Sequence, residues 1–521
     1  MTMMKIFSNL VYLLLFSIEI SGQSLPWVQL ENQESLFYQE LRLRNPKSFV
    51  SFESYPYDWK FYLQNQSGKT SFEVSWNKYL NDKYKFLFKD SSDYLGIEDL
   101  GYLRYGSKNI DTKPVRLSNR LNGFGNINKY LVFSTDIQMD TDASLDNDYR
   151  GRTVNAVNDS PIQGFLIHSH AYLKTEISGF EGMFGKQKLS WGPSITQTMI
   201  LSDNIPALDQ LWFRYTWKSI RLTHFWAQMD HSVFDSSQYF IEKTELTRNL
   251  FGTRVEFKVT ENLNFGISQT MIFPVKGFGF KLDYLNPLIS FFGERQNTGI
   301  SELDDNITYE TDLSYRQSGL NLFTSILIDD YSLDGTVGNK LGFQIGGEIS
   351  DPLLNFPATF SLEFTKINPK TYTVKSSLGP VWLNYVYYSK MNGTNIKDLS
   401  KGSIIGHPNG PDSWQLYFRN RIWNWYPFWF ETEAIYKSFG LESSLLPINT
   451  RSKTYDIIQT ESIVKIASHY DYENYLKASV FLIYDQVKNP EHISGKTSDV
   501  IFGLNLSFDL YYYYKLSDTF L

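Results

Sequence analysis

The sequence predicts an all-β protein, a large antiparallel transmembrane β-barrel with a small, partly helical N-terminal segment. Three observations predict it: long stretches in which apolar and polar residues alternate, polar turns between them, and many aromatic residues at low mean hydropathy. Phe, Tyr and Trp make up 17% of the 521 residues, and the mean hydropathy is −0.32. A membrane barrel combines these values, because every second strand residue faces a polar lumen while aromatic residues gather at the membrane interfaces.

Residues 1–22 have the features of a cleaved signal peptide. Lys5 forms a short positive region, an apolar stretch follows over 6–18, and small residues suited to cleavage come next. A membrane anchor is the alternative, but the apolar stretch is too short to span a bilayer well. No other segment reaches the length of a transmembrane helix, so we expect an exported chain without a helical anchor.

Residues 23–115 have a mixed pattern and are expected to form a periplasmic or plug segment. The apolar residues of 71–80 fall on one face of a helix. A second short helix is predicted over 36–45, where Phe37 and Leu41 are four residues apart. The segment is therefore expected to be partly helical.

Residues 116–521 are expected to form the barrel, because the apolar pattern there has a period of two. The clearest strand is 501–514, whose even positions are apolar and are predicted to face lipid: Phe502, Leu504, Leu506, Phe508, Leu510, Tyr512 and Tyr514. No long helical pattern separates such strands, so the connections are hairpins. About 400 residues at roughly 20–24 per strand and connection give about 16 to 20 strands. A soluble β-sandwich or propeller, which would bury these faces against a second sheet, is the alternative.

The composition argues against several functional classes. The chain has no cysteine, so neither disulfides nor thiolate chemistry is expected. The net charge of −7 is spread without a basic stripe, which argues against nucleic-acid binding. Outer-membrane enzymes use a Ser/His-based catalytic set, and none of the seven histidines lies in a nucleophile motif. We therefore predict a protein that is not an enzyme.

Two clusters have the composition of a metal site. One is a group of carboxylates: Asp140, Asp142, Asp146 and Asp148. It lacks the Gly and Glu that a helix–loop–helix calcium site requires, so a solvated loop is the alternative. His168 and His170 share a strand face, but the sequence offers no third ligand for zinc, and lumen-facing histidines are the alternative. We predict no metal and no other cofactor.

Sugar binding requires aromatic faces that stack on pyranose rings, with planar polar groups for the hydroxyls. Three local groups combine these residue types: Trp191, Gln197 and Asn204; Trp212 and Arg214; and His407, Asn409, Asp412 and Trp414. Ordinary lumen lining has the same composition and is the alternative for each residue.

Residues 185–215 resemble the signature of the Wzi family of outer-membrane capsule-assembly proteins. That signature joins Trp-Gly-Pro to a Leu-Ile-Leu-Ser-like stretch, an Asn-containing turn and a Pro. Here these elements are 191–193, 199–202, Asn204 and Pro206. Four later segments look like landmarks of Wzi-like proteins of Bacteroidetes: 250–273, 280–292, 363–372 and 404–412. The resemblance covers roughly residues 120–515 and implies an 18-stranded barrel that holds capsular polysaccharide at the cell surface as a lectin.

The signature segment has two interpretations. Gly192 and Pro193 force a bend, and the turns that follow suit a structural plug or constriction folded into the lumen. The alternative is direct ligand contact. Trp212 and Arg214 lie two residues apart on one strand face, where an indole can stack on a sugar ring and a guanidinium can pair with a uronic acid.

The sequence therefore predicts a monomeric barrel in the outer membrane of a Gram-negative bacterium. It is expected to bind and anchor or organise capsular or extracellular polysaccharide, with outer-membrane lipid as its other partner. A porin-like channel is one alternative. An accessory barrel of a surface adhesion, gliding or secretion machinery is another.

Overall fold

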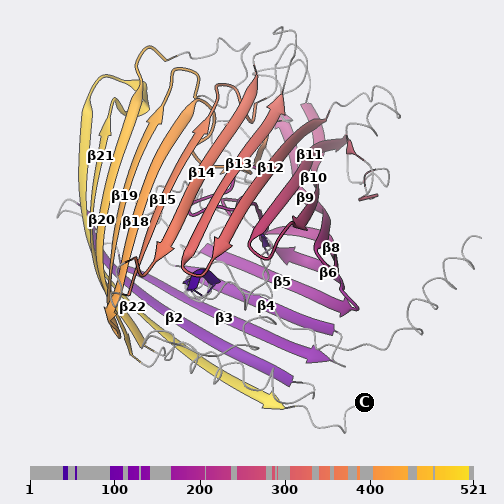
Figure 1. Ribbon diagram of the computed structural model, residues 1–521, viewed down its shortest axis with the longest axis horizontal. Helices are drawn as coiled ribbons and strands as arrows, with labels where there is room; N and C mark the ends of the chain where they lie inside the picture. Colours follow the sequence, from indigo (N-terminus) through magenta and orange to yellow (C-terminus); the bar gives the residue numbers. More distant parts are fainter. Residues whose placement is uncertain are drawn as a thin grey trace, which may run out of the picture.

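The fold is a closed barrel of 18 antiparallel strands (Figure 1). The computed structural model describes residues 39–40, 42–44, 53–55, 94–108, 115–127, 131–140, 166–205, 207–235, 243–276, 284, 286–287, 290–291, 305–330, 339–352, 357–373, 384–387, 403–443, 455–472 and 476–515. The alternating pattern of the sequence produces these strands, since a closed sheet pairs every backbone group and presents one apolar and one polar face.

The barrel strands follow one another in chain order, and each pairs with its neighbours. They are β2 (Tyr94–Lys108), β3 (Val115–Ile127), β4 (Leu131–Asp140), β5 (Leu166–Ile177), β6 (Phe180–Gln187), β8 (Leu208–Trp217), β9 (Ile220–Asp235), β10 (Lys243–Lys258), β11 (Leu263–Lys276), β12 (Asn306–Gln317), β13 (Leu320–Asp330), β14 (Lys340–Ser350), β15 (Ala358–Ile367), β18 (Ser413–Trp425), β19 (Phe428–Phe439), β20 (Gln459–Tyr472), β21 (Leu476–Lys488) and β22 (Lys496–Lys515). Four two-residue strands lie outside the barrel wall: β1 (Ser54–Tyr55), β7 (Ser190–Trp191), β16 (Val386–Tyr387) and β17 (Ser403–Ile404).

The barrel begins at β2, which pairs with β3 on one side and closes the barrel against β22 on the other. The predicted boundary at residue 116 is therefore wrong, and the segment before the barrel is shorter than expected. The sequence did not reveal β2 because the apolar pattern is broken on its outward face. Asp99 and Gly101 interrupt its apolar residues there, and the ring of Phe508 from β22 lies over Gly101.

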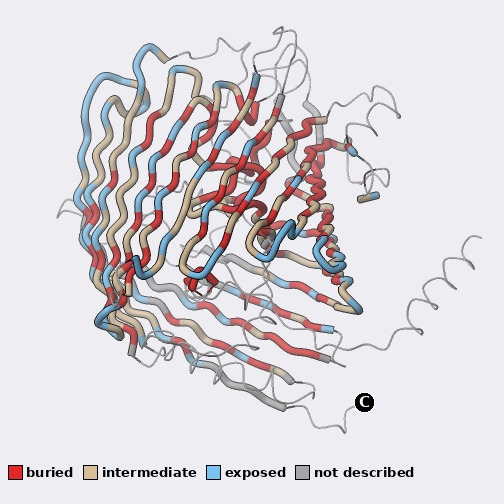
Figure 2. The backbone as a smooth tube through the Cα atoms, in the orientation of Figure 1, coloured by how far each residue is buried: buried red, intermediate tan, exposed pale blue. Residues whose placement is uncertain are grey.

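The outward face of the wall is apolar, as predicted for 501–514. On β22, the side chains of Phe502 and Leu510 are 48% and 58% exposed, whereas Asp509 between them faces inward and is 6% exposed. Figure 2 shows the same alternation of buried and exposed residues along neighbouring strands. The exposed set is the lipid-facing belt that the sequence predicts.

Short turns join the strands at one end of the barrel and long connections join them at the other. The turns 178–179, 218–219 and 318–319 contrast with the connections 188–207 and 368–412. In outer-membrane barrels the short turns lie in the periplasm and the long loops lie outside the cell. The two ends are named here the periplasmic end and the extracellular end accordingly.

Part of the N-terminal segment lies inside the barrel, where its indigo pieces appear in Figure 1. Residues 39–40 and 42–44 are helical, in agreement with the helix predicted over 36–45. The expected signal peptide over 1–22 and the expected helix over 71–80 lie outside the described residues. In the part of the chain that the structure describes, no helix has both the length and the apolar character needed to cross a membrane.

Candidate functional site

Three segments from the extracellular end fold into the lumen and pack against one another. They are the signature loop (188–205), residues 370–373 with 384–387, and residues 403–410, and together they are called the lumen plug. Backbone hydrogen bonds join them: the Ser202 amide donates to the Ile405 carbonyl at 2.8 Å, and the Ile405 amide donates to the Tyr385 carbonyl at 3.2 Å. The plug interpretation of the signature segment is therefore confirmed in geometry.

The centre of the lumen plug is apolar. Trp191 has no exposed surface and meets Phe225 of the wall edge-on, with ring centroids 5.1 Å apart. Tyr372 and Tyr385 stack at 5.9 Å. Their hydroxyls donate to the carbonyls of Met199 and Ile200, each at 2.7 Å.

Both tyrosine hydroxyls act as fixed hydrogen-bond donors. Burial raises the pKa of Tyr372 and that of Tyr385 well above the ordinary value, so both stay protonated. They satisfy two consecutive carbonyls of the signature loop, which would otherwise lie unpaired in an apolar environment.

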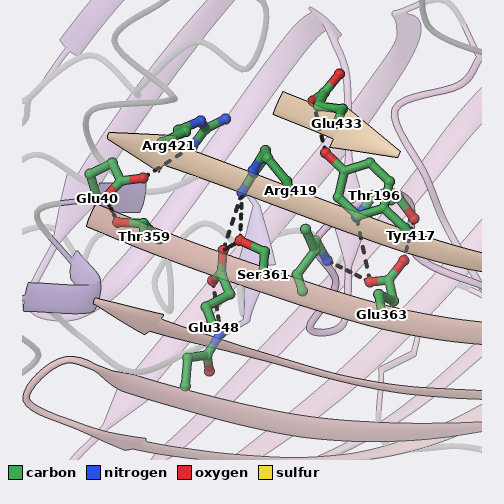
Figure 3. Close-up of polar contacts among 12 residues, drawn as sticks. Glu40, Thr196, Glu348, Thr359, Ser361, Glu363, Tyr417, Arg419, Arg421 and Glu433 are labelled. Carbon is green, nitrogen blue, oxygen red and sulfur yellow. Dashed lines mark hydrogen bonds and ion pairs between the residues drawn. The ribbon is translucent and has the colours of Figure 1, made fainter. Parts of the chain in front are cut away.

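Inward-facing carboxylates on the wall hold the backbone of the signature loop. Glu363 on β15 accepts a hydrogen bond from the Ile195 amide at 2.7 Å and a second from the Thr196 hydroxyl (Figure 3). Glu310 on β12 lies against the Ile200 amide. Glu363 thus binds an amide that has no partner within a regular strand, and the Glu310 carboxylate lies against Gly192 of the same loop, so both acids help to fix the course of the loop.

Below the lumen plug, the inward faces of β14, β15, β18 and β19 carry a ladder of paired charges (Figure 3). Arg419 reaches Glu348 at 3.2 Å, and Arg421 reaches Glu40 of the N-terminal segment at 3.1 Å. The Tyr417 hydroxyl donates to Glu433 at 2.8 Å. Since the acids and bases of this ladder are engaged with one another, they offer little free charge to a ligand.

The first predicted group, Trp191, Gln197 and Asn204, lies together within the lumen plug. Trp191 is fully buried, and Gln197 is 4% exposed while its backbone carbonyl accepts a hydrogen bond from Gln344 of β14 at 2.9 Å. Asn204 is partly exposed, and its amide nitrogen donates to the Ile404 carbonyl at 3.0 Å. All three contribute to the geometry of the plug.

The second group, Trp212 and Arg214, faces the lumen from β8, so the predicted shared strand face is confirmed. The guanidinium lies over the indole at 4.6 Å from the ring centroid, and neither side chain has exposed surface. Arg214 is 3.5 Å from Glu181, which also pairs with Lys174 at 3.1 Å. The indole face and the guanidinium that the sequence suggested for a sugar and a uronic acid are thus engaged within the chain.

The structure brings only part of the third group together: the Asn409 backbone amide donates to His407 Nδ1 at 3.4 Å, whereas Trp414 lies apart. His407 is 1% exposed inside the plug, and Asn409 donates to Gln415 at 3.0 Å. Asp412 accepts the Glu442 amide at 2.8 Å near the extracellular end. Trp414 points outward from the start of β18, is 36% exposed and packs in the lipid-facing belt, so it is separated from His407.

The sequence interpretation did not identify the four residues that hold the signature loop: Glu310, Glu363, Tyr372 and Tyr385. A signal existed for Glu363, because it is the single acid in the alternating stretch 358–365. Within the described residues no group of three His, Asp or Glu has the geometry of a metal site. The acidic cluster at 142–148 lies outside them, as does the side chain of His168.

Comparison with known proteins finds one family. The family model for the capsule assembly protein Wzi matches residues 166–424, a range that contains every segment of the lumen plug. No curated protein matches the chain.

Several solved barrels are similar to this chain. One is Escherichia coli Wzi, described as an outer-membrane protein involved in group 1 capsule assembly and as a carbohydrate-binding β-barrel. It is 14% identical with a TM-score of 0.56, over 90% of this chain and 96% of that one. OprD from Pseudomonas aeruginosa is 11% identical with a TM-score of 0.44, over 80% and 95% of the two chains. The family match and the 18-stranded fold place this chain in the Wzi capsule assembly family of the Gram-negative outer membrane.

Proposed function

We propose that this protein binds capsular or extracellular polysaccharide at the cell surface and anchors or organises it without catalysis. The family match supports this proposal, because it spans the segments that build the lumen plug. E. coli Wzi, described as a carbohydrate-binding barrel in capsule assembly, supports the class of ligand.

The lumen plug is the observation that carries the proposal. A general channel requires a continuous aqueous path, whereas here long extracellular connections turn inward and pack around an apolar core. Loops held in this way present a fixed surface to the cell exterior. A fixed surface suits recognition, since little ordering entropy is lost on binding.

The polysaccharide contacts are proposed at the extracellular side of the plug. Asn204 and Asp412 are predicted residues there that are partly exposed and carry planar polar groups, as is Asn409, whose side-chain amide is engaged with Gln415. Trp191, Gln197 and His407 lie behind them and would act as support. Trp212 and Arg214 would contact polymer only after the Arg214–Glu181 pair opens.

The first experiment compares wild type, a deletion strain and the deletion strain complemented with Asn204→Ala/Asp412→Asn. Asn suits position 412, whose φ of 48° lies in the left-handed region that Asn tolerates. We expect the deletion strain to shed polysaccharide. The double variant should reach normal outer-membrane levels and shed it partly, because losing such contacts weakens binding by about 1–3 kcal/mol. A deletion strain that keeps a normal capsule would refute the proposal.

A second experiment separates binding from transport. The purified barrel should be nearly silent in planar bilayers, because the plug occupies the lumen. A large, steady single-channel conductance would favour the porin-like alternative. Complementation with Trp212→Ala/Arg214→Ala tests the alternative site. If this variant reaches normal protein levels and still loses capsule, Trp212 and Arg214 contact the polysaccharide.

A further inference from the structure

The N-terminal segment is tied to the periplasmic end of the barrel by several contacts. The Gly319 amide, in a periplasmic turn, donates to the Leu43 carbonyl at 3.0 Å. Arg44 pairs with Asp351 of another periplasmic turn. Together with the Arg421–Glu40 pair, these contacts hold residues 39–44 inside the barrel at that end.

Glu53, later in the same segment, binds the barrel wall deeper in the lumen. It is 2% exposed and accepts hydrogen bonds from Arg316 and Ser314, each at 2.8 Å. Burial alone would raise the pKa of Glu53, but Arg316 and Arg42 outweigh burial and hold the pKa below its ordinary value. Glu53 is therefore a charged anchor for the residues that follow it.

The residues after Glu53 pair directly with the signature loop. β1 and β7 form a two-stranded antiparallel sheet in which Ser54 pairs with Trp191 and Tyr55 with Ser190. The Trp191 amide donates to the Leu201 carbonyl at 2.9 Å, so the loop folds back on the strand that the N-terminal segment extends. A segment anchored at the periplasmic end thus completes the sheet of the extracellular plug.

A second, buried connection joins the same two segments through the wall. The Glu53 amide donates to Glu256 at 2.6 Å, and Glu256 lies 3.3 Å from Arg254. Arg254 also pairs with Asp312 at 2.6 Å. Arg254 also attracts Glu310 electrostatically, and the Glu310 carboxylate lies against Gly192 of the signature loop.

We propose that the N-terminal segment and the signature loop form one coupled unit. Displacing residues 39–55 at the periplasmic end removes a strand and a charged anchor from the plug, so the loop becomes accessible from the cell exterior. The two routes are the β1–β7 sheet and the chain of contacts from Glu53 to Glu310. In this way, release of the N-terminal segment at the periplasmic end changes the exposure of the signature loop at the cell surface.

The absence of cysteine from the natural chain makes the test simple. Ser194→Cys places a single thiol in the signature loop. Intact cells carrying this reporter are treated with a membrane-impermeant maleimide. In the Glu53→Ala background we expect labelling to be faster by about tenfold, because the loop opens more often. Glu461→Ala is the matched control: it also removes an inward-facing carboxylate, paired with Lys437 at 2.9 Å, but it touches neither segment.

A cross-link provides the converse test without removing any charge. Tyr55→Cys and Ser190→Cys, at paired positions, are added to the reporter, and their thiols are oxidised before labelling so that Ser194→Cys carries the one free thiol. Oxidation should slow labelling below the reporter alone, reduction should reverse it, and the cross-link should restore protection in the Glu53→Ala background. Equal rates for Glu53→Ala and Glu461→Ala, or a cross-link without effect, would overturn the coupling. The assay uses no glycan, so such a failure leaves the proposed polysaccharide binding standing.

Discussion

At the scale of single residues, inward-facing acids determine where the signature loop lies. Glu363 satisfies amide and hydroxyl donors of the loop from a strand that otherwise lines the lumen with small polar residues. A donor left unpaired in such a place costs about 1–3 kcal/mol. The position of the plug therefore depends on a few side chains that belong to the wall.

Replacement of Glu363 by Leu should lower the unfolding free energy by about 2–4 kcal/mol, because more than one buried donor loses its acceptor. Urea titration of the purified barrel in detergent measures the change. Glu442→Leu is the control, since its pair with Lys370 is solvent-exposed and such pairs contribute about 0–1 kcal/mol. Similar losses in both variants would show that Glu363 does not hold the loop.

His407 makes the plug sensitive to acid. Burial, with a smaller contribution from Lys437, lowers the pKa of His407 to about 3, so the folded protein keeps it neutral. The unfolded chain binds the proton near pH 6.5. Above pH 6.5 neither state binds this proton, so His407 does not change the unfolding free energy. Between pH 6.5 and pH 3 only the unfolded chain binds it, so the fold is destabilised increasingly as the pH falls.

We expect His407→Gln to flatten the fall in unfolding free energy between pH 7 and pH 4 by about 1 kcal/mol per pH unit. Denaturant titrations of both proteins at several pH values within this range measure the slope. Parallel curves would mean that His407 is solvated or already charged in the folded state.

At the scale of elements, the strands follow the period of the sequence. On β22, Phe502, Phe508 and Leu510 at even positions are exposed on the outward face, so Leu506→Arg near the bilayer midplane should cost about 2–4 kcal/mol. Asn505→Arg, on the inward face, should be tolerated. Refolding titrations into lipid vesicles compare the two variants, and equal tolerance would contradict the orientation of this strand.

Where the alternation of apolar and polar residues is broken or too short, the sequence does not reveal the strand. β2 was missed because Asp99 and Gly101 occupy outward positions where the apolar pattern would continue. β1 and β7 are two residues each and pair across more than a hundred residues of chain, so neither has a local pattern to detect. The signature loop was recognisable by its motif, yet its partners on β12 and β15 depend on barrel register, which composition does not specify.

At the scale of the whole molecule, closure makes the barrel one cooperative unit. Every wall strand pairs with two neighbours around the ring, including the β2–β22 seam. We expect the protein to run at different positions on a gel before and after boiling in detergent, because the closed sheet resists unfolding until heated. A single position under both conditions would be inconsistent with a closed barrel.

The seam between β2 and β22 also restricts the order of biogenesis. β2 opens the wall and β22 completes it, so the ring cannot shut until the most C-terminal strand has arrived. Residues 39–40, 42–44 and 53–55 precede β2 and lie inside that ring. Threading Arg42 and Glu53 through a finished barrel would strip water from charges before their partners are in reach. We therefore expect the first capture of the N-terminal segment to occur while the sheet is still open, as part of membrane insertion.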